Sequence, residues 1–445
     1  MKMTSLSHLL LLLVLAYDVV KGETEEIVHL EFPDWFENLE NETGPPEWFQ
    51  RLPGYECSQE ARWPGDQTFP FECPIMQASA TANVSNLESI EITLHTVHRL
   101  RPADINVIGA LGDSLSSANG AGACFLPEVL YMYRGQCFST GGDGSFETNP
   151  TIANILRKFN PDLKGYSLET NWWTSPQAGM NVGIPGAVAD DLPRQARALI
   201  NAMKDDPNID FENDWKLITL FIGGNDLCGW CRNKEKRSAE MYTYWINEAI
   251  KILHDGLPRT YVAVIGILLI PEVDIMDKPL CRFMHNQYCS CAMDPSIRND
   301  FWNITRDYQE TLQTAIESRM WDDKDDFTAS LLPCLHESHM PLLEDGSPDY
   351  SYFAPDCFHF SHKAHSGFGA ILWNNMMERV GERSEDFLEV EDLKCPSDTF
   401  PFLYTNVNSD PGFQVELPSG SPAGIRPAIN LTLFALAAIC LFLNL

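Results

Sequence analysis

The chain contains a serine, an aspartate and a histidine whose positions suit nucleophilic catalysis. Ser114 lies in the turn sequence Gly112-Asp113-Ser114-Leu115, directly after the apolar run 105–111. A serine attacks a carbonyl carbon when a general base takes its proton and a third group orients that base. Asp356 and His359 are three residues apart, so one loop can carry both the base and its orienting carboxylate. The alternative is that Ser114 only caps an ordinary strand-to-helix turn.

Acyl transfer also needs hydrogen-bond donors for the negative charge that develops on the carbonyl oxygen. Three candidates are the backbone N–H groups of Ser114 and Gly186 and the side-chain amide of Asn225. Gly186 closes the turn cluster 181–186, and Asn225 lies in a second turn cluster, 223–226, at the end of another apolar run. Either residue taken alone is explained by turn chemistry. Together with Ser114 they predict an oxyanion hole.

Two further histidines, His362 and His365, follow His359 at the same spacing. Imidazoles three residues apart can share a helix face with Asp356, so a metal-dependent hydrolase is one alternative. Surface histidines at the start of a helix are another. No zinc signature accompanies these residues, and we favour a serine hydrolase with no metal and no cofactor.

Apolar runs alternate with amphipathic segments through the middle of the chain. Strands buried on both faces are predicted at 105–111, 215–222, 261–270 and 327–332. Helices are predicted at 152–159, 190–203, 242–253, 299–321 and 366–380. This alternation predicts an α/β fold in which helices flank a parallel sheet in three layers. The turn clusters would then lie at the carboxyl ends of the strands, where such sheets bind ligands.

Four blocks, 112–115, 181–186, 223–226 and 356–359, resemble in content and order those of the GDSL or SGNH hydrolases. The resemblance covers roughly residues 100–381, and the segments 100–105, 191–196 and 373–376 look like the membrane-associated phospholipase B group of that family. It implies a flavodoxin-like sheet and metal-independent hydrolysis of glycerophospholipids or lysophospholipids. It also implies that Ser114 is the nucleophile, His359 the base and Asp356 its orienting group, with Ser114, Gly186 and Asn225 as oxyanion donors. Vertebrate phospholipase B carries several tandem hydrolase repeats, whereas this chain has one.

The two ends of the chain are typical of an exported, membrane-tethered protein. Residues 1–22, with Lys2 before a short apolar core, predict a secretory signal peptide. We expect an irregular extension at 23–99, the hydrolase domain at 100–393, a linker at 394–421 and an apolar tail at 422–445. The tail has no Lys or Arg after it and follows the small residues 419–421, which favours a lipid-anchor signal with attachment at Ser419. A membrane-spanning helix is the alternative.

The cysteines and glycosylation motifs agree with export. Twelve of the 13 cysteines precede the tail, and in an exported chain they are expected to form disulfides. Cys228 and Cys231 form a C-x-x-C pair with no second pair to complete a zinc site, so we expect disulfide partners elsewhere. Glycosylation acceptors are predicted at Asn41, Asn83 and Asn303.

Charge restricts the class of partner. With 62 acidic against 31 basic side chains the net charge is -31, which disfavours binding to nucleic acids and to anionic membranes. We therefore predict a secreted, membrane-tethered phospholipase of the serine hydrolase class that acts on neutral or zwitterionic lipid. The alternatives are an esterase for acylated carbohydrates or small molecules, and an inactive surface receptor on a hydrolase scaffold.

Overall fold

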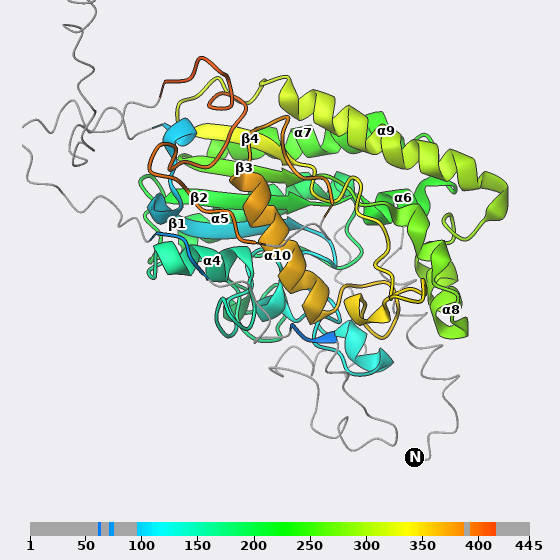
Figure 1. Cartoon of the computed structure of the whole chain (residues 1–445). Helices are drawn as coiled ribbons and strands as arrows, with labels where there is room; N and C mark the ends of the chain where they lie inside the picture. The colour runs from blue at the N-terminus through cyan, green and yellow to red at the C-terminus, as the bar shows by residue number, and fades with distance from the viewer. Residues whose placement is uncertain (1–60, 64–70, 75–95, 387–391, 415–445) are drawn as a thin grey trace, which may run out of the picture.

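Four parallel strands form the centre of the molecule, as Figure 1 shows. The computed structural model describes residues 61–63, 71–74, 96–386 and 392–414. The strands are β1 (Ile105–Gly112), β2 (Trp215–Phe221), β3 (Thr260–Ile265) and β4 (Phe327–Leu332), and they lie side by side in chain order. Nearly every residue in them is buried, as expected for a parallel sheet covered on both faces.

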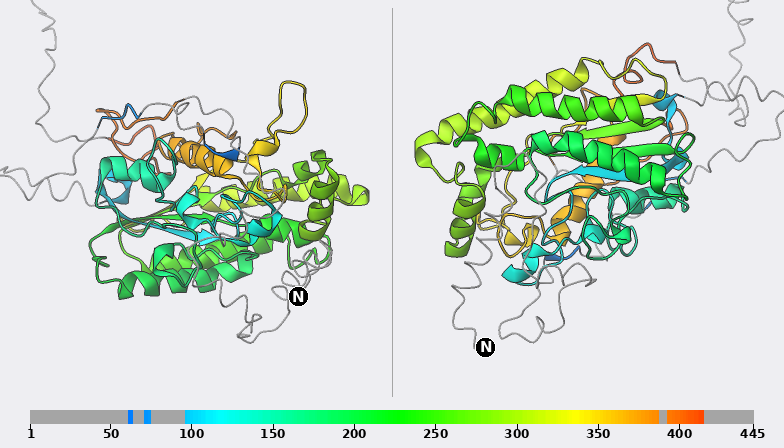
Figure 2. Two further views of the ribbon diagram at one scale, coloured as in Figure 1. Left: turned by 90° about the horizontal axis from the view of Figure 1, so that it is seen from below. Right: turned by 180° about the vertical axis from the view of Figure 1, so that it is seen from behind.

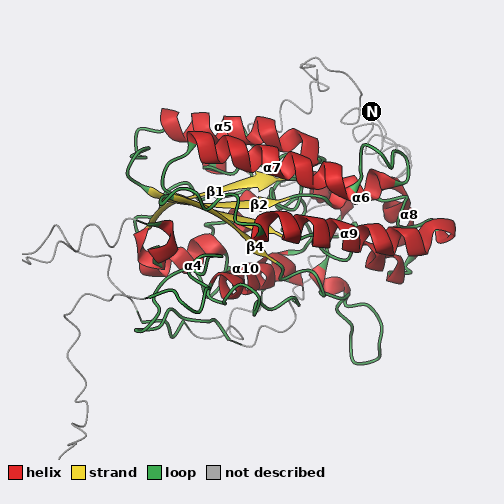
Figure 3. Cartoon of the chain, turned by 90° about the horizontal axis from the view of Figure 1, so that it is seen from above, coloured by secondary structure: helices red, strands yellow, loops and turns green. Residues whose placement is uncertain are grey.

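Helices cover both faces of this sheet, so the predicted three-layer α/β fold is confirmed. The helices are α4 (Ile152–Phe159), α5 (Leu192–Asp205), α6 (Gly224–Trp230), α7 (Ala239–Gly256), α8 (Pro279–Tyr288), α9 (Arg298–Glu317) and α10 (His362–Met376). Figures 2 and 3 show α5 and α7 on one face, with α9 beside α7, and α4 and α10 on the other. Because the four strands are parallel, their carboxyl ends all lie at the same end of the sheet.

An irregular segment covers the outer edge of β1, which the sequence pattern did not predict. The Ile108 N–H donates to the Lys164 carbonyl at 3.0 Å, and the Ala110 N–H donates to the Met180 carbonyl at 3.0 Å. Parallel bridges at Lys164 and Asn181 thus take the place of a further strand next to β1. With this segment counted, the order across the sheet is that of flavodoxin-like folds.

Several element boundaries differ from those predicted, and the larger shifts include the end of β3 and the start of α10. β3 ends at Ile265, not Ile270, because the chain leaves the sheet after Gly266 and enters a short 3-10 helix over Ile270–Ile275 with Pro271 in its first turn. The residues that follow β3 are still apolar because they pack in the interior. α10 begins at His362, not at 366, because Ser361 caps it by accepting a hydrogen bond from the Ala364 N–H.

Both flanks of the domain pack onto it where they are described. The His98 ring hydrogen-bonds the Thr405 hydroxyl at 2.9 Å, and the Leu403 N–H donates to the Leu100 carbonyl at 2.8 Å. The segment 392–414, part of the expected linker, therefore lies against the hydrolase domain.

Disulfides join distant parts of the chain. The pairs are Cys73–Cys395, Cys228–Cys289, Cys231–Cys291 and Cys281–Cys357, and Cys124 is also disulfide-bonded. The expectation that Cys228 and Cys231 pair with other cysteines is confirmed. The expectation that all twelve cysteines pair is wrong, because Cys137 and Cys334 are free thiols. Each is fully buried in the core.

Several predictions concern residues outside the described part of the chain. These are the signal peptide 1–22, the glycosylation acceptors Asn41 and Asn83, the anchor site Ser419 and the tail 422–445. Asn303 is exposed on α9. Among the described residues, no helix combines the length and the apolar character that crossing a bilayer requires.

Candidate active site

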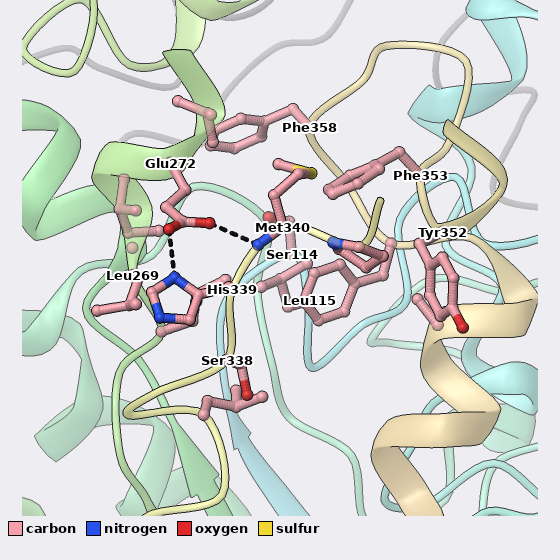
Figure 4. Close-up of a pocket in the computed structure, with 18 of the residues that line it drawn as sticks. Ser114, Leu115, Leu269, Glu272, Ser338, His339, Met340, Tyr352, Phe353 and Phe358 are labelled. Atoms are coloured by element: carbon pink, nitrogen blue, oxygen red, sulfur yellow. Dashed lines mark hydrogen bonds and ion pairs between the residues drawn. The ribbon is translucent and has the colours of Figure 1, made fainter. Parts of the chain in front are cut away.

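A mainly apolar cavity opens at the carboxyl ends of the strands. Its walls come from the turn after β1, the start of α6, the segments after β3 and β4, and the loop before α10. Figure 4 shows Ser114 among leucine, methionine and phenylalanine side chains in this cavity. The apolar lining residues include Leu115, Leu269, Val273, Met340, Phe353, Phe358 and Phe360. Such a lining suits an aliphatic chain, and the few polar groups in it can hold one reacting bond.

Ser114 sits in a tight turn that begins where β1 ends. The Asp113 carboxylate accepts a hydrogen bond from the Leu115 N–H at 2.9 Å and so closes the turn around Ser114. Gly112 has a φ of 151°, and a Cβ there would lie 2.2 Å from the Phe221 carbonyl oxygen. Only glycine fits this position. The serine itself is 8% exposed, at the wall of the cavity.

Helix α5 fixes the residue at the end of β1. The Gln195 side chain accepts a hydrogen bond from the Gly112 N–H at 2.8 Å and donates one to the Gly112 carbonyl at 2.9 Å. Gln195 is buried, so both bonds are shielded from water. This two-way contact holds the base of the Ser114 turn against α5.

Asp356 and His359 form a hydrogen-bonded pair, as their spacing predicted. The distance from Asp356 Oδ2 to His359 Nδ1 is 2.6 Å. The other carboxylate oxygen accepts the N–H groups of Phe358 and His359, each at 3.1 Å. Burial by itself would raise the pKa of Asp356, but the charge of His359 and these hydrogen bonds outweigh it and lower the pKa below its ordinary value. The carboxylate is therefore ionised at neutral pH and fixes the orientation of the imidazole.

His359 lies near Ser114 without bonding to it. Phe358 and Phe360, its two neighbours in the chain, line the same cavity as Ser114. The charge of His359 also acts on Asp113, the residue before Ser114, and partly opposes the rise in pKa that burial of Asp113 causes. No hydrogen bond joins the Ser114 hydroxyl to the His359 ring, a contact that in enzymes without substrate often tightens only when substrate binds.

Asn225 and the segment after Gly186 are in direct contact. One N–H of the Asn225 amide donates to the Ala187 carbonyl at 2.9 Å, which leaves the second N–H for another acceptor. Asn225 lines the cavity together with Ser114. Among the described residues, neither the Ser114 N–H nor the Gly186 N–H has an acceptor. The three predicted oxyanion donors are thus all available for a ligand, although Gly186 is not part of the cavity wall.

A buried arginine, which sequence reasoning missed, stabilises the loop before Gly186. Arg134 is inaccessible to solvent and donates to the Asn181 side chain at 2.7 Å and to the Gly183 carbonyl at 2.7 Å. Burial lowers the pKa of Arg134 to about 9. Asn181 in turn donates to the Ser116 carbonyl at 2.8 Å, which connects this loop to the turn of Ser114.

A second carboxylate–imidazole pair, also missed, lies on the cavity wall. The distance from Glu272 Oε1 to His339 Nδ1 is 2.5 Å. The other Glu272 oxygen accepts the Met340 N–H at 2.5 Å. Glu272 follows β3 and His339 follows β4, and no short motif marks either residue in the sequence.

The two remaining histidines of the 359–365 series have structural contacts. His362 Nδ1 accepts the Trp63 N–H at 3.2 Å, and His365 is fully buried against Phe138. Burial lowers the pKa of His365 to about 3. Within the described ranges no three His, Cys, Asp or Glu side chains are placed together as metal ligands.

Comparisons with known proteins agree with this geometry. A family model described as GDSL-like Lipase/Acylhydrolase matches residues 108–372. Membrane-associated phospholipase B1 from Rattus norvegicus is 43% identical over 355 residues, which are 75% of this chain and 24% of the relative. The Homo sapiens protein of the same name is 43% identical over 346 residues, with the same shares of the two chains. The chain therefore spans about a quarter of the length of the curated relatives it matches.

One solved structure that matches is described as a GDSL-like lipase from Parabacteroides merdae. It is 11% identical, covers 63% of this chain and 99% of its own chain, and has a TM-score of 0.31.

Proposed function

Because the chain belongs to the GDSL-like lipase/acylhydrolase family, we propose that it is a serine hydrolase that cleaves acyl esters of glycerophospholipids and lysophospholipids. The observation that carries the proposal is the Asp356–His359 pair at 2.6 Å beside a cavity that holds Ser114 and Asn225. The apolar lining supports an acyl chain as the bound group. The identity to two phospholipase B1 proteins supports a phospholipid as its source.

In the proposed mechanism Ser114 attacks the ester carbonyl while His359 takes the hydroxyl proton through Nε2. Asp356 stabilises the imidazolium that forms. The tetrahedral intermediate places its negative oxygen against the N–H groups of Ser114 and Gly186 and the free N–H of Asn225. Collapse expels the alcohol, which receives the proton from His359. A water molecule activated by His359 then hydrolyses the acyl-enzyme and releases the fatty acid.

The test combines turnover with covalent labelling. We expect the full chain to release fatty acid from phosphatidylcholine or lysophosphatidylcholine micelles, and we expect Ser114→Ala to lose nearly all of this activity while it is still secreted. A fluorophosphonate probe should modify the wild type at Ser114 alone. Hydrolysis by the Ser114→Ala variant at the wild-type rate would disprove the mechanism. Preferential cleavage of acetylated sugars would assign the same chemistry to a carbohydrate esterase, and no labelling at all would favour an inactive receptor.

We further propose that the protein acts outside the cell while it is itself tethered to the membrane. The disulfides support passage through an oxidising compartment. Tethering rests on the sequence pattern of the tail. Treatment of expressing cells with a phosphatidylinositol-specific phospholipase C should release the activity into the medium, and substitution of Ser419 should prevent surface retention. Activity that resists this enzyme would point to a spanning helix.

A further inference from the structure

The Glu272–His339 pair is built from two separate segments at the wall of the cavity. Glu272 belongs to the 3-10 helix over Ile270–Ile275, and His339 lies beyond the end of β4. Figure 4 shows Glu272 and His339 on one side of the cavity, with Phe353 and Tyr352 on the opposite side. Because Glu272 uses one oxygen for the His339 ring and the other for the Met340 N–H, the ring has a defined position.

The Glu272–His339 pair is more exposed than the Asp356–His359 pair, so it is better placed to bind a ligand that enters from solvent. The His339 side chain is 59% exposed, whereas the His359 side chain is 12% exposed. Among the described residues that line the cavity, His339 is the one basic side chain. Within the described part of the chain its Nε2 has no hydrogen bond, and the exposed ring can meet a ligand that enters from solvent.

The charge state of His339 favours an anionic ligand. The hydrogen bond with Glu272 raises the pKa of the imidazole, its exposure leaves little burial to oppose this, and the charges of Glu272, Glu337 and Asp386 act in the same direction. A protonated ring donates from Nε2 while Nδ1 remains bound to Glu272. On the described cavity wall, such a donor is the one cationic group that an anionic ligand can meet.

We infer that His339, held by Glu272, is the binding residue for the phosphodiester group of a lysophospholipid whose acyl ester lies at Ser114. The inference rests on the proposed function and adds a binding residue for the phosphodiester, which is the group that distinguishes a phospholipid from a neutral acylglycerol. In a lysophospholipid a glycerol unit separates the ester from the phosphate, so one bound molecule presents an apolar chain, an ester and an anion together. The cavity wall contains a partner for each of the three groups, namely apolar side chains, Ser114 and His339.

The experiment compares two substrates that differ in the phosphate-containing head group. Octanoyl lysophosphatidylcholine and monooctanoylglycerol are supplied below their micelle concentrations, so that binding to an interface does not enter the rates. We expect His339→Gln to lower kcat/KM for the lysophospholipid about tenfold or more, the loss typical of a charge-assisted hydrogen bond, and to leave monooctanoylglycerol nearly unchanged. His339→Arg keeps a cation and should retain most of the preference for the lysophospholipid.

The matched control is His254→Gln, which removes an imidazole that binds a carboxylate, Asp323 at 2.7 Å, outside the cavity. This variant should leave the ratio of the two kcat/KM values at its wild-type level. Equal loss on both substrates in His339→Gln would overturn the inference and leave the proposed function intact, since His339 would then serve the chemistry or the fold. A wild-type protein that releases fatty acid from monooctanoylglycerol but not from the lysophospholipid would overturn both.

Discussion

At the scale of single residues, Asp356 binds its neighbours in a way that a neutral amide cannot copy. One oxygen accepts two backbone N–H groups and the other accepts from His359 Nδ1. The first interaction shapes the loop and the second sets the tautomer of the imidazole. A substitution that keeps the hydrogen bonds from the backbone but reverses the direction of the hydrogen bond with His359 separates these two functions.

We predict that Asp356→Asn lowers kcat about a thousandfold or more while it changes thermal unfolding little. The asparagine oxygen can still accept from the backbone, but its NH₂ group now donates to His359 Nδ1 and forces the ring proton onto Nε2, where it blocks acceptance of the Ser114 proton. Turnover of phosphatidylcholine micelles and the unfolding temperature are measured on the same sample. A kcat within tenfold of the wild type would exclude Asp356 as the orienting group.

Asn225 is the one predicted oxyanion donor that a side-chain substitution removes, because Ser114 and Gly186 would donate from the backbone. We expect Asn225→Ala to lower kcat by about a hundredfold or more, the usual cost of losing one oxyanion donor. KM should change little, since the charge on the oxygen develops in the transition state. If only KM changed, Asn225 would be a contact to the bound substrate and not to the oxyanion.

Asp113 makes the stability of the fold depend on pH. Burial raises the pKa of Asp113 from 3.8 to about 7, and Asp226 acts in the same direction. Because the folded state holds this proton and the unfolded state loses it near pH 4, the contribution is fully present below that pH and is lost as pH rises to about 7. We predict that Asp113→Asn, which still accepts the Leu115 N–H, gains unfolding temperature relative to the wild type between about pH 4 and pH 8. A constant difference across this range would show that Asp113 is ionised in the folded protein.

At the scale of elements, the end of β1 depends on α5 through Gln195. Gln195→Leu leaves the Gly112 N–H buried without its acceptor, which typically costs about 1–3 kcal/mol. We predict a lower unfolding temperature together with a lower kcat, because the same peptide group precedes the Ser114 turn. Arg194→Leu on the exposed face of the helix is the matched control and should change stability by less than about 0.5 kcal/mol. Loss of stability without any change in kcat would limit Gln195 to a role in the fold.

The strands were predictable because burial on both faces leaves nearly continuous apolar runs such as 215–221. The segment that covers the edge of β1 was not predictable from the sequence, because Lys164 and Asn181 pair with β1 from turns that carry no strand pattern. The end of β3 was missed for a related reason. Residues that leave a sheet but remain in the core, such as Ile267 and Leu269, keep the same apolar character.

The sequence singles out five candidate site residues, Ser114, Gly186, Asn225, Asp356 and His359, because each falls in a short block with a recognisable local pattern. Their catalytic roles remain predictions that the substitutions above test. The residues around them were not predictable. Arg134, Gln195 and the Glu272–His339 pair act across separate segments, and their partners depend on the path of the chain in three dimensions.

At the scale of the whole molecule, the net charge of -31 controls which membrane the protein can approach. We predict faster hydrolysis of phosphatidylcholine vesicles than of vesicles that also contain phosphatidylglycerol, with the difference shrinking at about 0.5 M salt as the charges are screened. Fatty acid release from both vesicle types at low and high ionic strength measures this. Equal rates at low salt would mean that apolar contacts alone govern adsorption.

Two disulfides connect the segments that carry Asn225 and Asp356. Asn225 lies in the first turn of α6, which also contains Cys228. Cys228 is bonded to Cys289, just after α8. Cys281, at the start of α8, is bonded to Cys357, the residue after Asp356. These two disulfides therefore link Asn225, a predicted oxyanion donor, to the loop of the predicted acid–base pair, although the two segments are far apart in the sequence. We expect these links to fix the spacing of the two segments once the chain is oxidised, and a chain folded in a reducing compartment would lack them.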